Sequence, residues 1–60
     1  MTVLNLMDFS CHSMKVCGQI RYIIKHNKTG GVCEVMRDRE KAKDLTRYLQ
    51  LQSDKQRGLK

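Results

Sequence analysis

The sequence lacks a long apolar run. Its longest uninterrupted apolar stretch is Tyr22-Ile23-Ile24, whereas a helix that crosses a bilayer needs about 20 apolar residues. The segment from Met1 to Asp8 also lacks the basic start and extended apolar core of a secretory signal. We therefore expect no transmembrane helix, no membrane partner and a cytoplasmic location.

An even set of cysteines is also lacking. The three cysteines are an odd number, which favours a reduced setting over a disulfide framework. Together with the two histidines they supply zinc-ligand atoms, but there is no Cys-x-x-Cys motif and no pair of histidines three to five residues apart. We therefore expect ordinary thiols, with Cys33 in the core, and no metal or other cofactor. The residues weighed as zinc ligands are Cys11, His12, Cys17, His26 and Cys33.

The signatures of an enzyme are missing as well. A chain of 60 residues buries only about 60% of its unfolded surface, which leaves no room for a deep active site. Ser10 and His12, flanked by Asp8 and Ser13, have the side-chain types of nucleophilic catalysis, but no oxyanion hole or buried base accompanies them. No glycine-rich phosphate loop precedes a helix. We expect a protein that binds a partner and does not catalyse a reaction.

Acidic residues are few relative to basic ones. Twelve Lys and Arg residues against six Asp and Glu residues give a formal net charge of +6. Such a charge attracts polyanions and acidic surfaces over long range. The balance favours encounters with nucleic acid, an anionic membrane or an acidic protein, without selecting among them. The partners we consider are double-stranded DNA and an acidic host protein.

What is present is a β-hairpin pattern over residues 15–36. Ile20, Tyr22 and Ile24 alternate along its first strand and should share one face. The turn at residues 27–31 contains Gly30, which can adopt the left-handed conformation of a short hairpin loop. Gly18 is expected to mark a bend or bulge in the first strand.

The remaining strands are less well defined by the sequence. Residues 2–9 suit a short strand or an apolar arm, and residues 10–13 resemble a polar turn. In the second hairpin strand, over residues 32–36, a slip of one residue would exchange the two faces. We prefer Cys33 and Val35 facing inward, because this register places Glu34 in water.

A helix is predicted over residues 39–57. Asp38 is a suitable N-cap, and Gly58 lies where a helix end favours glycine. Its apolar stripe consists of Ala42, Leu45 and Leu49, with Thr46 and Gln52 at the edges. The predicted structure is a single α+β domain over residues 1–60, in which this helix covers one face of an antiparallel sheet of two or three strands.

The uncovered sheet face is predicted to be basic. A ribbon can enter the DNA major groove, where Arg reads guanine, Gln reads adenine and lysines hold phosphates. The alternative is a solvated face whose lysines discourage edge pairing. The candidate DNA-binding residues of the hairpin are Lys15, Gln19, Arg21, Lys25 and Lys28, and those of the helix are Arg39, Lys43 and Arg47.

Two tracts carry a family resemblance: Ile20-Arg21-Tyr22-Ile23-Ile24-Lys25-His26-Asn27-Lys28-Thr29-Gly30-Gly31 and Arg37-Asp38-Arg39-Glu40-Lys41-Ala42. Together they resemble the N-terminal arm-type DNA-binding domain of phage tyrosine recombinases. The resemblance implies a three-stranded sheet in the major groove braced by one helix, with Arg21, Lys25 and Lys28 in contact with DNA. No catalytic domain follows in this sequence, so it implies an accessory protein of a phage or mobile element.

A second hypothesis is that the chain docks on a host protein. The uncharged segment over residues 2–7 could add to the edge of a partner's sheet. Apolar side chains expected to be exposed could act as anchors. The candidate protein-contact residues are Leu4, Leu6, Ile23, Tyr48 and Leu51. The oligomeric state is left open by the sequence.

Overall fold

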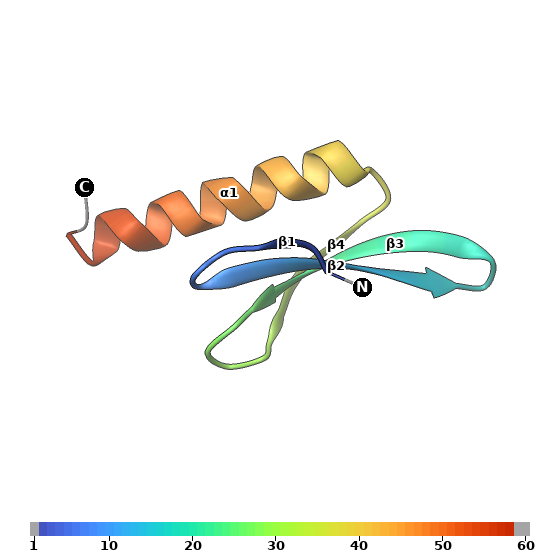
Figure 1. Cartoon of the computed structure of the whole chain (residues 1–60), viewed down its shortest axis with the longest axis horizontal. Coiled ribbons are helices and arrows are strands. Elements are labelled where there is room, and N and C mark those ends of the chain that lie inside the picture. The colour runs from blue at the N-terminus through green and yellow to red at the C-terminus, as the bar shows by residue number, and fades with distance from the viewer. Residues whose placement is uncertain (1, 59–60) are drawn as a thin grey trace.

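The computed structural model describes residues 2–58, which form one antiparallel sheet and one helix (Figure 1). The elements follow the order β1 (Thr2–Asn5), β2 (Phe9–Val16), β3 (Gln19–His26), β4 (Val32–Met36) and α1 (Arg39–Gln56). The four strands lie side by side in chain order. This architecture confirms the predicted α+β class, with four strands in place of two or three.

The helix packs on one face of the sheet, here called the inner face and represented by Cys11 and Ile24. These two residues lie opposite each other in β2 and β3 and are fully buried together with Ala42 of α1. The surrounding half-buried apolar residues are Val3, Leu4, Phe9, Tyr22, Met36, Leu45 and Leu49. The opposite face, here called the outer face, carries the alternate residues of each strand, such as Arg21 and Ile23.

Strand β2 contains the segment that was predicted to be a turn. Ser10, Cys11 and His12 pair with β1 on one side and with β3 on the other. Pairing on both sides satisfies their backbone groups, and this outweighs the local preference of small polar residues for turns. The prediction of a turn at residues 10–13 is therefore wrong.

A tight turn at Cys17 and Gly18 joins β2 to β3. Val16 pairs with Gln19 across it, and the φ angles of Cys17 and Gly18 are 51° and 78°. Two central residues with positive φ are what a type I′ hairpin turn requires. Gly18 therefore reverses the chain, whereas the sequence predicted a bend or bulge within one strand.

The β3–β4 turn contains Gly30 as predicted. Gly30 has a φ of 74°, and its N–H donates to the carbonyl of His26 at 2.7 Å. The register of β4 differs from the predicted one, in which Cys33 and Val35 face inward. In the structure, Ile23 pairs with Val35 and Tyr22 pairs with Met36. Val35 thus lies on the outer face and Met36 on the inner face, while Glu34 stays exposed because β4 is an edge strand.

Helix α1 begins where the sequence predicted and ends one residue earlier. The Asp38 carboxylate accepts the N–H of Lys41 at 3.1 Å, as an N-cap does. The buried helix residues are Ala42, Thr46 and Gln50, so Thr46 lies at the centre of the buried stripe and not at its edge. Within residues 2–58, no helix combines the length and the apolar character needed to cross a membrane.

Candidate nucleic-acid interface

Part of the β2–β3 hairpin extends beyond its neighbours as a two-stranded ribbon. Strand β1 pairs with β2 only as far as His12, and β4 pairs with β3 only as far as Tyr22. The segment over residues 14–21 therefore has no further strand beside it within the described chain, and we call it the ribbon. Figure 1 shows the ribbon projecting past the start of α1, and all of its residues except Arg21 are exposed.

Arg21 and Gln19 form a linked pair on the outer side of the ribbon. Arg21 lies opposite Met14, and Gln19 lies opposite Val16. The Arg21 guanidinium donates to the Gln19 side-chain oxygen at 2.6 Å and to the Ile20 carbonyl at 3.3 Å. A guanidinium has five N–H donors, so these two bonds leave donors for a ligand while they restrain the side chain.

The other outer-face cations lie toward the β3–β4 turn. Lys25 follows Arg21 by four residues on the same face, a separation of about 13 Å along a strand. Lys25 is half-buried beside Ser10, whereas Lys28 is exposed in the turn itself. Ile23 lies between Arg21 and Lys25 and is half-buried.

Lys15 was predicted on the same face as these residues, and this prediction is wrong. Lys15 pairs with Ile20, which belongs to the inner-face series of Tyr22 and Ile24. The turn at Cys17 and Gly18 reverses the chain, so the alternation of side chains cannot be counted straight through it. Lys15 therefore lies on the other side of the ribbon from Arg21.

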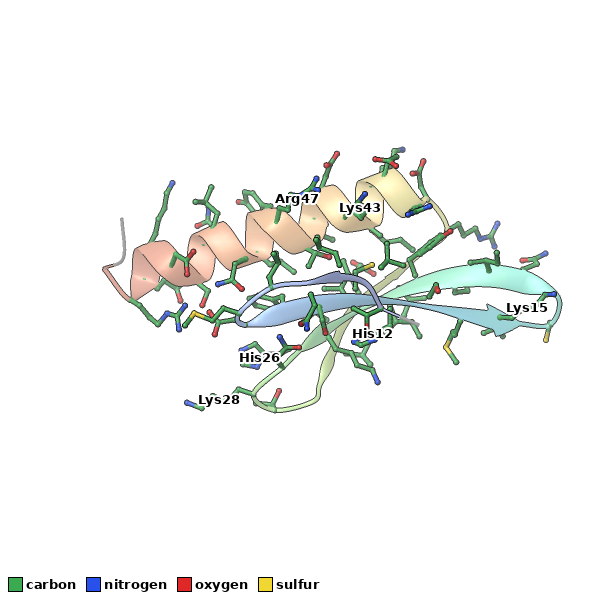
Figure 2. The ribbon with its side chains drawn as sticks, viewed as in Figure 1. His12, Lys15, His26, Lys28, Lys43 and Arg47 are labelled. Carbon is green, nitrogen blue, oxygen red and sulfur yellow. The ribbon has the colours of Figure 1, made fainter. Side chains whose placement is uncertain are left out.

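The cations of the helix form a separate group. Because α1 covers the inner face, Lys43 and Arg47 do not join the outer-face residues (Figure 2). Arg39, at the start of α1, lines a cavity on the inner face. Arg47 pairs with Asp44 at 3.5 Å in an exposed position. The structure thus divides the predicted DNA-binding residues among the outer face, the inner side of the ribbon and the helix.

The predicted protein-contact residues are also dispersed. Leu4 packs against the core, and Leu6 is half-buried in the β1–β2 loop. Ile23 lies on the outer face, whereas Tyr48 and Leu51 are 56% and 52% exposed on the helix. Tyr48 and Leu51, three residues apart on α1, are exposed and close enough to act together.

Ser10 and His12, whose side-chain types were weighed for nucleophilic catalysis, belong to a hydrogen-bond network. Ser10 is 2% exposed, and its hydroxyl donates to the Asn27 side-chain oxygen at 2.8 Å. With its single proton used in this way, Ser10 accepts from Nε2 of His12, also at 2.8 Å. Asn27 in turn donates to the carbonyl of Leu6 at 2.8 Å. The network anchors the β1–β2 loop to the β3–β4 turn.

Sequence reasoning missed the cluster around Asp8. Its carboxylate accepts from Ser53 at 2.8 Å and from Gln50 at 3.0 Å, and it forms an ion pair with Arg57 at 2.6 Å. The hydrogen bond from Ser53 is the main cause that lowers the pKa of Asp8, with Gln50 and Arg57 adding to it and burial opposing it. The cluster fastens the β1–β2 loop to the last turns of α1. In the sequence, the only feature that points to this cluster is that Gln50, Ser53 and Arg57 are spaced so as to share one side of a helix.

The cysteines are dispersed through the fold. Cys11 is buried, and burial raises the pKa of its thiol. Cys17 is exposed at the tip of the ribbon, and Cys33 is exposed on β4, so the predicted core position of Cys33 is wrong. Among residues 2–58, no three His, Cys, Asp or Glu side chains are grouped so as to hold a metal ion.

Comparison of the chain with protein-family models, with curated proteins and with solved structures found no match. The resemblance to the arm-type domain of phage tyrosine recombinases therefore stays a prediction. The candidate site is defined by the geometry of the ribbon and the outer face alone.

Proposed function

We propose that this chain is a cytoplasmic, non-catalytic protein that binds double-stranded DNA, of the accessory type found in phages or mobile elements. In this proposal the ribbon enters the major groove, and the rest of the outer face lies against the phosphate backbone. The observation that carries the proposal is the linked pair of Arg21 and Gln19 on the open side of a projecting ribbon.

The dimensions of the ribbon suit the groove better than those of the whole sheet. Neighbouring strands lie about 4.8 Å apart, so the outermost strands of a four-stranded sheet are separated by about 14 Å before side chains are added. The major groove is about 12 Å wide and admits a two-stranded ribbon. The resemblance implied the insertion of a three-stranded sheet, and the proposal instead inserts only the two-stranded ribbon of residues 14–21.

The side chains of the pair match the donor and acceptor pattern of base edges. Arg21 can donate two hydrogen bonds to guanine, and Gln19 can both donate to and accept from adenine. The two residues are about 6.7 Å apart along the strand, and successive base pairs are about 3.4 Å apart. The pair can therefore contact base pairs one or two steps apart.

Lys25 and Lys28 are assigned to the phosphates. Lys25 shares the outer face with Arg21, and Lys28 is exposed at the end of the hairpin. Contacts between lysine and phosphate carry no sequence information, but they fix the orientation of the protein on the duplex. The net charge of +6 favours encounter with DNA from any direction.

Fluorescence anisotropy at several salt concentrations tests this function. Lys25→Ala and Lys28→Ala should weaken binding to all duplexes and reduce the salt slope by about 1 each. Arg21→Ala should lower the discrimination between duplex sequences. The matched control is Lys55→Ala, which removes the same charge from an exposed position near the end of the helix. Binding that is independent of salt, or equal losses for Lys55→Ala and Lys25→Ala, would contradict the proposal.

Tyr48 and Leu51 favour a second candidate, docking on an acidic host protein. Both are large apolar side chains that are exposed on the helix. A pull-down from nuclease-treated lysate, compared between the wild-type chain and a Tyr48→Ser, Leu51→Ser double variant, tests this candidate. A partner that is retained by the wild type and lost by the variant supports docking, and equal retention contradicts it.

A further inference from the structure

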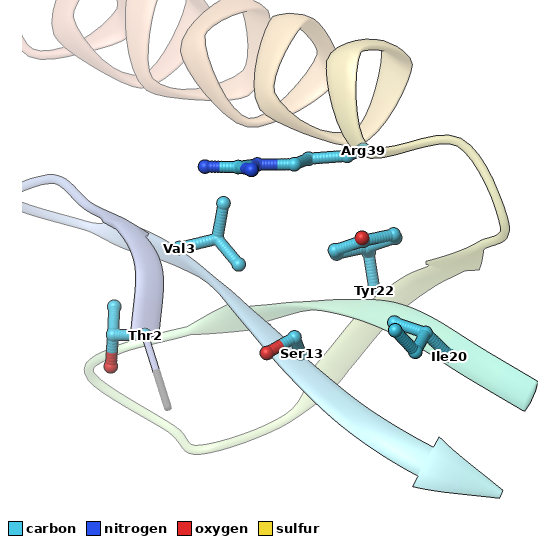
Figure 3. A pocket seen from close by; sticks show the side chains of 6 residues that line it. All are labelled: Thr2, Val3, Ser13, Ile20, Tyr22 and Arg39. Carbon is cyan, nitrogen blue, oxygen red and sulfur yellow. The ribbon is translucent and has the colours of Figure 1, made fainter.

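A cavity of about 230 Å³ opens on the inner face, beside the start of α1 (Figure 3). It is lined by Thr2, Val3, Ser13, Ile20, Tyr22 and Arg39. The cavity opens on the inner face, whereas the proposed base contacts are made from the outer face. The two sites share only Ile20, a ribbon residue whose side chain lies on the inner face.

The cavity arises from the small side chain of Ser13. Ser13 lies opposite Tyr22 on β2, the strand between β1 and β3. The larger side chains of Val3 and Tyr22 stand around it, as Figure 3 shows. Helix α1 begins only at Arg39, so it leaves this part of the inner face uncovered, and Ile20 is 53% exposed there.

A cation lies over this space, which is lined by both polar and apolar side chains. Figure 3 shows the Arg39 side chain extending from α1 toward the region above Val3. The ion pairs found among residues 2–58 involve Arg47 and Arg57, and Arg39 takes part in none of them. The guanidinium therefore faces the cavity opening without a carboxylate from the described part of the chain.

We propose that this cavity binds a compact apolar group that bears a carboxylate. An apolar cavity of about 150 Å³ holds a benzene molecule, so the space here accommodates a ring of that size with a carboxylate beside it. Val3, Ile20 and Tyr22 supply apolar contacts, and Arg39 supplies the planar donor arrangement that matches a carboxylate. The same chemistry occurs in free aryl carboxylic acids and in the carboxy-terminal phenylalanine of a peptide.

Titration of phenylacetate into isotope-labelled protein, followed by NMR, tests the proposal. The largest shift changes should occur at Val3, Ser13, Tyr22 and the Arg39 side chain, with a dissociation constant in the millimolar range, as expected for a small ligand in an open site. Acetate lacks the ring and should bind more weakly than phenylacetate. Phenylacetamide lacks the charge and should bind up to about fivefold more weakly. Equal binding of either compound, or shift changes at other residues, would overturn the proposal.

Two variants and two peptides complete the test. Arg39→Gln should weaken phenylacetate binding about fivefold, whereas Arg47→Gln, the same change farther along α1, should leave it unchanged. Equal effects of the two variants would overturn the role of Arg39, and the amide spectrum of each variant verifies its fold. Gly-Gly-Phe with a free carboxy terminus should bind more tightly than its amide. Tighter binding of this peptide than of phenylacetate supports a peptide terminus as the source, and weaker binding supports a free acid.

Discussion

Replacing isoleucine by valine at three positions of β3 provides a direct test of which sheet face α1 covers. Ile24 is fully buried against Ala42, whereas Ile20 is 53% exposed beyond the start of the helix. Ile23 is half-buried on the outer face. The same methylene is thus removed from a covered position, an uncovered position and the opposite face of a single strand.

The expected effects follow from burial. Ile24→Val should lower the free energy of unfolding by about 1 kcal/mol, because it removes one buried methylene and leaves a small void. In a domain of this size that loss lowers the melting temperature by about 4 to 8 °C. Ile20→Val should change the stability by less than about 0.5 kcal/mol, and Ile23→Val should fall between the two. Valine is preferred to alanine because Ile24→Ala removes about 2 to 5 kcal/mol, which is comparable to the total stability of a domain this small.

Thermal and urea unfolding followed by circular dichroism measures all three variants. The order of destabilisation should be Ile24→Val, then Ile23→Val, then Ile20→Val. If Ile23→Val destabilises the protein more than Ile24→Val does, the helix covers the other face. The assignment of Arg21 and Lys25 to the open face would then be refuted.

Three further predictions concern the loop cluster, the helix cap and the ribbon turn. The pKa of Asp8 is lowered, so the ionised carboxylate stabilises the fold above its ordinary pKa of 3.8. This stabilisation is lost as the pH falls through the pKa of Asp8 in the folded state. Acid unfolding should show this loss, and Asp8→Asn should remove that part of the pH dependence. Asp38→Ala should lower the free energy of unfolding by about 1 kcal/mol because it removes the N-cap, whereas Asp38→Asn should preserve most of it, and equal losses would contradict the cap. Cys17→Asn should raise the melting temperature, since asparagine tolerates the φ of 51° better than cysteine does; a decrease would contradict a type I′ turn.

The sequence was sufficient for the elements whose signals are local. The alternation of Ile20, Tyr22 and Ile24 predicted β3 and its inward face, and Gly30 predicted the turn that follows. Asp38 predicted the start of α1, because an N-cap acts on backbone groups only a few residues away. Two of the fully buried residues, Ile24 and Ala42, come from these locally predictable elements.

Elements that depend on distant partners could not be predicted in this way. Ser10, Cys11 and His12 form a strand because β1 and β3 flank them, and their own side chains favour a turn. The β4 register places Glu34 on the inner face, which is tolerated only because the edge of the sheet stays open to solvent. Both outcomes are set by tertiary pairing, which overrides local preference.

The candidate site likewise contains some residues whose positions follow from local sequence and others whose positions do not. The outer-face positions of Gln19, Arg21 and Lys25 follow from the two-residue period within one strand. Lys15 was misplaced because the turn at Cys17 and Gly18 was taken for a bend. The Asp8 cluster joins residues more than 40 positions apart in the chain, so no local pattern could reveal it.

The amide chemical-shift map of the labelled protein, recorded with and without a short duplex DNA, tests the proposed DNA-binding surface most directly. We predict that the largest changes occur at Gln19, Arg21 and Lys25, and that they weaken as salt is raised. Tyr48 and Lys55 on the helix should be unaffected. Changes concentrated on α1, with the ribbon unperturbed, would contradict the assignment of the outer face as the DNA-binding surface.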